Sequence, residues 1–185
     1  MPRSVTTTST DGVLLGTAGI YAKLGAAYMA LRDPHRAIEA LRHLRLLQPV
    51  SFDALFQLAR AEGAAAETER GKGHLQQSSE LLEQAAVDLI EALLLSPGHD
   101  PTLQALETVY DLLAAPPGAV REDGGSRTLN LDHPLLQRHF RRASVQFVRD
   151  LAASGQAERA AEWKRRMIGE LQVPAELFDM PRKGR

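Results

Sequence analysis

The sequence predicts an all-α protein of about seven helices, arranged as antiparallel pairs. Apolar residues recur with a period close to 3.6 along almost the whole 185-residue chain. Aromatic residues make up only 5% of it, and the apolar volume is mostly Leu and Ala, so strand-forming residues are scarce. Pro and Gly mark most boundaries between the periodic segments. Together these observations exclude an all-β fold.

The N-terminal part begins with a polar segment and continues into the most apolar stretch of the chain. Residues 1–11 are rich in Ser and Thr, so we expect them to be disordered. The first helix is expected from about Asp11 to Leu31. Lys23 and four glycines interrupt its apolar run, so it predicts a packed helix rather than a membrane span or a signal segment.

Residues typical of helix ends predict the next two helices. Asp33 followed by Pro34 is typical of a capped helix start, and the second helix is expected to run to about Gln48. Pro49 then ends it. Ser51 has the right side chain and position to cap the third helix.

A polar insertion separates the third helix from the fourth. Residues 66–79 include two glycines and predict a loop or a frayed helical extension. The fourth helix is expected over 79–95, where the Ser-Pro-Gly of 96–98 ends it. Asp100 followed by proline repeats the cap signal and predicts a fifth helix over 100–114.

The C-terminal third begins with a long connection. Residues 115–133 contain clustered Pro and Gly, which predicts a mobile loop or, alternatively, a functional one. Pro134 opens a sixth helix, and a seventh is expected over about 157–171. We interpret 134–179 as a degenerate helix pair followed by a short turn, and 180–185 as a disordered basic tail.

An internal repeat underlies the first five helices. An offset of 34 residues aligns the first helix with the third, and an offset of 48 aligns the second with the fourth. The two offsets differ by 14, so one insertion of 14 residues between the third and fourth helices explains both.

The first unit carries the pattern of a known repeat. Its diagnostic residues are Tyr21, Leu24, Gly25, Tyr28, Ala37, Leu41, Leu44 and Pro49. Residues 18–50 thus resemble a tetratricopeptide repeat, with Tyr21 for the usual Trp and Leu44 for the usual Ala. Residues 12–114 resemble an array of such repeats, although Glu62 replaces the tyrosine of the second unit. The resemblance implies an α-solenoid with Gly25 at a close helix crossing.

The same resemblance implies a concave groove, lined by the first helix of each pair, that holds a partner protein or peptide. The groove positions are Ala22, Ala26, Met29, Phe56, Arg60, Gln104 and Thr108. Phe56 can serve as an apolar anchor there, or it can simply pack between helices. The Lys and Asn clamp of chaperone-binding relatives is replaced by Ala22, Ala26, Gln57, Pro101 and Ala105. A chaperone tail with a C-terminal carboxylate is therefore not the expected partner.

Charge is unevenly distributed along the chain. Residues 1–133 hold 11 Lys and Arg against 17 Asp and Glu, whereas residues 134–185 hold 11 against 6. A candidate docking face for an acidic partner consists of Arg138, Arg141, Arg142 and Arg149; the alternative is a solvated helix face. The net charge of −1 argues against general binding to nucleic acid or a membrane.

No motif for catalysis, metal binding or cofactor binding is found in the sequence. It has no cysteine, and its six histidines lack metal-ligand spacing, so we expect them at the surface. Gly71-Lys72-Gly73 lacks the remaining residues of a phosphate loop. Glu80, Glu83 and Glu91 are expected on solvent faces. We therefore predict no catalytic residue, no metal site and no cofactor.

The sequence thus predicts a non-catalytic, cytoplasmic module for protein–protein interaction. Two alternatives remain open. The chain can be a helical accessory domain of a larger enzyme such as a glycosyltransferase or kinase, or it can be a structural module that self-associates into a homo-oligomer.

Overall fold

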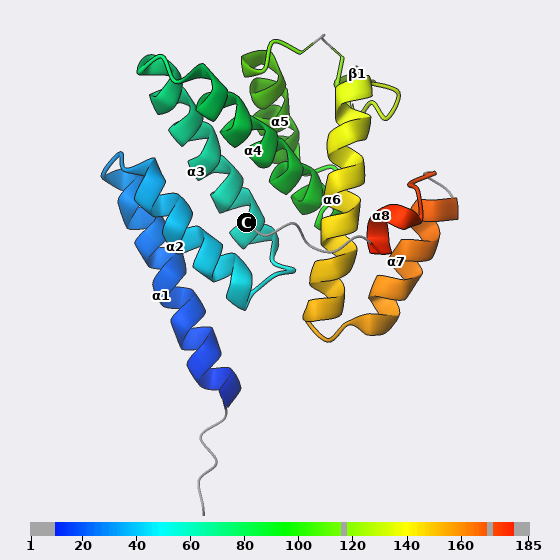
Figure 1. Cartoon of the computed structure of the whole chain (residues 1–185), viewed down its shortest axis with the longest axis horizontal. Helices are drawn as coiled ribbons and strands as arrows, with labels where there is room; N and C mark the ends of the chain where they lie inside the picture. The colour runs from blue at the N-terminus through cyan, green and yellow to red at the C-terminus, as the bar shows by residue number, and fades with distance from the viewer. Residues whose placement is uncertain (1–9, 116–117, 170–171, 180–185) are drawn as a thin grey trace, which may run out of the picture.

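The computed structural model describes residues 10–115, 118–169 and 172–179. Within these ranges the chain forms eight helices and one small hairpin (Figure 1). The helices are α1 (Thr10–Ala30), α2 (Pro34–Leu47), α3 (Phe52–Gly71), α4 (Leu75–Leu95), α5 (Asp100–Leu112), α6 (Pro134–Ala153), α7 (Ala157–Gly169) and α8 (Glu176–Asp179). The two antiparallel strands are β1 (Val120–Asp123) and β2 (Ser126–Leu129). The prediction of an all-α fold is confirmed, with the hairpin as an addition.

Helices α1 to α5 follow one another as packed neighbours (Figure 1). Each contacts the next, and the first helices of the expected pairs also meet, because α1 touches α3 and α3 touches α5. Beyond α5 the order changes: α6 packs on α4, and α7 then packs on α6. Helix α4 therefore lies between α3 on one side and α6 on the other.

The apolar interior has two main parts. One lies between α1, α2 and α3 around Leu41, Leu44 and Leu58. The other extends from α3 to α7 around Leu89 and Leu106. None of the helices described has both the length and the apolarity that crossing a membrane requires.

Most of the predicted helix starts are where the capping signals placed them. The side chain of Asp33 accepts a hydrogen bond from the backbone N–H of Arg36, and Ser51 Oγ accepts one from the N–H of Ala54. Pro134 opens α6 as expected. At α5 the expectation is wrong by one position, since His99 and not Asp100 is the capping residue.

The close crossing predicted at Gly25 is confirmed. A Cβ atom built on Gly25 would lie 2.6 Å from Cγ of Leu41, which is shorter than carbon atoms tolerate. The missing side chain lets α1 approach α2 closely. Leu24, its neighbour in the repeat pattern, points outward and is exposed.

The predicted insertion at 66–79 is not a loop outside the core. Helix α3 continues to Gly71 and α4 already begins at Leu75, so the extra residues lengthen both helices of one hairpin. Ala66, Glu69 and Ser78 from this segment are buried. Only the short connection around Gly73, which has a φ of 82°, is a turn.

The prediction of a mobile loop over 115–133 is also wrong for the part described. Residues 120–129 form the β1–β2 hairpin, which packs on α5, and Ala119 and Val120 belong to the core. The expected disorder of 1–11 falls partly within α1, which includes residues 10 and 11. Residues 1–9 and 180–185 lie outside the described residues.

Candidate functional site

The predicted groove residues lie on three helices that are neighbours in space. On α1, Ala26 is exposed, while Ala22 and Met29 are half-buried and pack against the core formed with α2 and α3. On α5, Gln104 and Thr108 are both exposed, and each makes a hydrogen bond within its own helix. Helix α1 touches α3, and α3 touches α5, so the helices that carry these residues are neighbours.

Phe56 and Arg60, the groove residues of α3, differ in their surroundings. Phe56 is half-buried against the core, and its ring lies 5.7 Å from the rings of both Phe52 and His99. Packing between helices therefore accounts for much of its surface. Arg60 is exposed one turn further along α3 and is accessible to a ligand.

The candidate basic face is largely engaged in contacts within the molecule. Arg138 and Arg142 on α6 both pair with Glu83 on α4. Arg149 donates a hydrogen bond to the carbonyl of Leu177, at a distance of 3.3 Å. Arg141 is exposed and borders a cavity of about 260 Å³. These arginines help to fix α6 on α4 and on the C-terminal segment.

Helix α1 carries a second apolar surface that sequence reasoning missed. Ile20, Leu24 and Leu31 are 64%, 38% and 74% exposed. Ile20 and Leu24 lie one turn apart on α1, and Leu31 is the first residue after it, so the three form a stripe that continues just past the end of the helix. This stripe faces away from the Gly25 side, which packs on α2.

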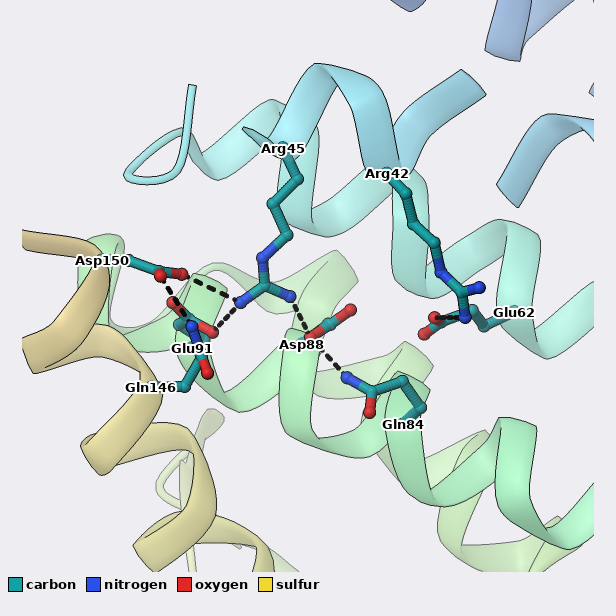
Figure 2. Close-up of polar contacts among 8 residues, drawn as sticks. All are labelled: Arg42, Arg45, Glu62, Gln84, Asp88, Glu91, Gln146 and Asp150. Carbon is teal, nitrogen blue, oxygen red and sulfur yellow. Dashed lines mark hydrogen bonds and ion pairs between the residues drawn. The ribbon is translucent and has the colours of Figure 1, made fainter. Parts of the chain in front are cut away.

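The most unusual polar arrangement is a buried charge cluster that joins α2, α4 and α6 (Figure 2). Arg45 of α2 points into the interior and pairs with three carboxylates. Its Nη1 donates to Asp88, and its Nη2 lies 2.5 Å from Glu91 Oε2 and 3.2 Å from Asp150 Oδ2. All four residues are buried. One guanidinium group therefore links three helices.

Two glutamines complete the arrangement in Figure 2. Gln84 donates to Asp88 Oδ1 at 3.0 Å, and Gln146 donates to Asp150 Oδ1 at 2.6 Å. Beside the cluster, Arg42 reaches the fully buried Glu62, with 3.6 Å between Nη2 and Oε1. Glu62 is the residue that replaces the tyrosine expected in the second repeat.

Burial and excess negative charge change the acid–base properties of the cluster. Burial alone would lower the pKa of Arg45, but the charges of Asp88, Glu91 and Asp150 outweigh this and raise it. Burial raises the pKa of Glu91 well above its usual range, against the opposing effect of Arg45. The prediction that Glu91 lies on a solvent face is wrong, because its side chain is fully buried between α4 and its neighbours.

An open cavity leads to one side of the cluster. It has a volume of about 660 Å³ and lies between the end of α2 and the end of α6. Arg45 and Asp150 form part of its wall, together with Arg42, Pro49 and Ser154. The cluster is therefore buried within the helices but borders a space that solvent can enter.

A second polar cluster stabilises the turn between α3 and α4. The buried carboxylate of Glu69 lies 2.8 Å from Lys72 Nζ, 2.6 Å from His74 Nδ1 and 2.8 Å from His35 Nε2. Hydrogen bonds from Lys72, His74 and His35 lower the pKa of Glu69 to about 2, although burial acts in the opposite direction. The extended hairpin of 66–79 is thus tied back to α2.

Two histidines are buried, contrary to the expectation that all lie at the surface. His139 of α6 is fully buried, and its Nδ1 lies 3.1 Å from the hydroxyl of Tyr110, while His133 is also buried. Burial and the nearby charges of Arg138 and Arg142 lower the pKa of His139 to about 4. Among the described residues, no group of His, Asp and Glu has the geometry to hold a metal ion.

Sequence reasoning missed the Arg45 cluster, although one signal was present. Asp88 and Glu91 interrupt an otherwise apolar run in α4, at a spacing that places both on one helix face.

Comparison with models of protein families, with curated proteins and with solved structures yields no match for this chain.

Proposed function

We propose that this protein is a non-catalytic protein–protein interaction module, a tetratricopeptide-like scaffold that holds a partner polypeptide against α1, α3 and α5. The observation that supports the proposal is the adjacency of these three helices, each of which carries predicted groove residues. Ala26, Arg60, Gln104 and Thr108 are exposed there.

The chemistry of this surface suits a mixed apolar and polar segment. Ala22 and Ala26 leave room for close approach of a helix or an extended chain. Arg60 can pair with an acidic side chain, and Gln104 and Thr108 can exchange their intrahelical hydrogen bonds for bonds to a partner. The buried charge cluster has a structural part in this proposal, because it keeps α4 and α6 in place behind the groove.

Site-directed photo-crosslinking tests the proposal. A benzophenone side chain at Ala26 should yield discrete adducts with a partner polypeptide when the chain is expressed in its own cells. The same group at Ala161, which is equally exposed but lies on α7, should not. Ala26→Arg should abolish adducts formed from a second probe at Thr108, whereas Ala161→Arg should preserve them. Identical adduct patterns at Ala26 and Ala161 would contradict the groove.

Self-association is a second candidate, favoured by the exposed stripe of Ile20, Leu24 and Leu31. Monomeric proteins rarely leave large apolar side chains aligned on one face. Analytical ultracentrifugation of the full chain should show an oligomer that Leu24→Glu dissociates. A wild-type chain that sediments as a monomer at about 100 μM, where even weak dimers form, would remove this candidate.

A further inference from the structure

A cavity between the hairpin and α7 has features that none of the surfaces above shares. It has a volume of about 530 Å³. Its wall is formed by the end of α4, the turn after it, one residue of α5, strand β2 and helix α7. Cavities of this size and character are the usual sites of ligand binding.

All four residues of β2, Ser126 to Leu129, line this cavity, and β1 contributes none of the described lining. Successive side chains of a strand point to opposite faces. A cavity bordered by four consecutive strand residues therefore lies along the edge of the strand. The other edge of β2 is occupied by β1, so the cavity borders its open edge.

The hydrogen bonds of the hairpin show which backbone groups face this edge. The N–H of Asn130 donates to the carbonyl of Ala119 at 2.8 Å, which makes these two residues a hydrogen-bonded pair. Bonded and non-bonded pairs alternate along antiparallel strands. Arg127 and Leu129 therefore belong to non-bonded pairs, and their N–H and C=O groups point away from β1, toward the cavity.

The side chains around the cavity indicate what could lie against that edge. Leu93, Leu94, Leu103, Trp163 and Met167 form an apolar floor. Arg127 and Arg166 also line it, and the guanidinium of Arg127 pairs with Asp100 at 3.1 Å and with Glu107 at 3.8 Å on α5, so its charge is already balanced within the molecule. The guanidinium of Arg166 lies 5.1 Å from the centre of the Trp163 ring, so charge and apolar surface meet at one point.

We infer that this cavity binds an extended polypeptide segment, which adds to the open edge of β2 as a third antiparallel or parallel strand. The segment would place an apolar side chain on the floor beside Trp163. Recognition by backbone pairing plus side-chain pockets is an established mode of peptide binding. This site uses different helices from the proposed groove on α1, α3 and α5 and does not depend on it.

Selection from a phage library of random nine-residue peptides tests the inference on the full chain. Peptides that also bind an Arg127→Pro decoy are removed, which discards binders of other surfaces. Proline deletes one outward N–H of β2 without touching a bond to β1. Arg127→Ala is the matched control, because it removes the same charge and keeps the N–H. We expect enriched peptides with apolar residues at alternate positions, bound at least about tenfold more tightly by Arg127→Ala than by Arg127→Pro.

Further measurements distinguish backbone pairing with β2 from binding without such pairing. Bound peptide should slow hydrogen exchange of the Arg127 and Leu129 amides and shift the fluorescence of Trp163, the only tryptophan. N-methylation along the peptide should weaken binding at every second residue, since alternate amides face β2. The amide of Asn130 should stay protected in Arg127→Pro, which shows that the hairpin persists. Absence of enriched peptides, binding without amide protection, or equal affinity of the two Arg127 variants would overturn the inference.

Discussion

The contact between α1 and α2 and the contact among α2, α4 and α6 are both buried, but opposite chemistry holds them together. At the first, Gly25 lets Leu41 pack against backbone, and the crossing is apolar. At the second, Arg45 binds three carboxylates within the interior. The stability of an apolar contact does not depend on pH, and one apolar side chain can often replace another. A buried ion cluster, in contrast, requires all its members and one arrangement of the helices. The N-terminal pair is therefore built for close packing, and the junction of α4 and α6 for a defined orientation.

The largest effect should come from breaking the charged junction. Arg45→Met would leave Asp88, Glu91 and Asp150 buried without their common cation. Removal of one partner from a buried ion pair typically costs about 3–5 kcal/mol, which is a large part of the roughly 5–15 kcal/mol that stabilises a typical domain. Urea titration followed by circular dichroism measures this loss.

The control for this variant is an ion pair at the surface. Arg36 is exposed and pairs with Asp33 at 3.5 Å. Arg36→Ala should therefore lower the free energy of unfolding by less than about 1 kcal/mol. If Arg45→Met were as mild as the Arg36 variant, the cluster would not be the link between the helices.

A variant that replaces every member of the cluster by an apolar residue should recover most of the stability, because it leaves no carboxylate buried without a cation. Its substitutions are Arg45→Met, Asp88→Leu, Glu91→Leu and Asp150→Leu, combined in one chain.

The next effect should come from overfilling the apolar contact. Gly25→Leu would force four carbon atoms into the space occupied by Leu41, and overpacking of this kind typically costs about 1–3 kcal/mol. The same denaturant titration gives the value. Leu41→Ala in the Gly25→Leu background should restore part of the lost stability. An unchanged midpoint for Gly25→Leu would contradict the close crossing of α1 and α2.

The two contacts also differ in how far the sequence predicts them. The Asp33 cap and the start of α6 follow from local signals, and the crossing at Gly25 from the resemblance to a known repeat; the structure agrees with each. The cluster does not follow, because a charged residue on a helix is normally placed at the surface. Helix α4 is covered by α3 and by α6, so residues 85–93 are all buried and both of its faces are interior. Only the long-range packing of α6 on α4 shows that Glu91 has no solvent face.

The two segments predicted as loops differ from the structure for a related reason. The polar residues of 66–79 indicated a loop, yet Ala65 and Ala66 are buried and continue the packed face of α3. Alanine carries little hydrophobic signal, although it favours helix strongly. The hairpin of 120–129 has strands of four residues each, and such short strands need the support of α5, which no local pattern reveals.

The pH dependence of stability should distinguish the charged junction from the apolar one. The raised pKa of Glu91 means that the folded state holds this proton more tightly than the unfolded chain, whose Glu pKa is about 4.3. Its stabilising contribution is therefore complete below about pH 4.3 and is lost as pH rises through the folded-state pKa. Glu91→Gln mimics the protonated form, so its stability relative to wild type should increase with pH from about pH 4.3 up to the folded-state pKa of Glu91.

Thermal denaturation of both proteins between pH 4 and pH 8 measures the difference directly. Gly25→Ala serves as the apolar counterpart, and its difference from wild type should stay constant over the same range. Subtracting the wild-type curve removes common contributions such as that of His139. A Glu91→Gln difference that is equally flat would show that this carboxyl group titrates alike in the folded and unfolded states.

The smallest effect on stability, with the largest on binding, is expected at the groove surface. Arg60 is exposed on α3, and substitutions at such positions usually change stability by less than about 0.5 kcal/mol. Arg60→Glu should therefore keep the melting temperature while it abolishes the partner adducts formed from Ala26, because it reverses a charge on the proposed contact.

Phe56→Ser should lower the melting temperature by several degrees, since Phe56 packs against the core and against Phe52 and His99. Loss of adducts in Phe56→Ser alone would place the effect in folding, whereas loss in Arg60→Glu at full stability would place it on the groove.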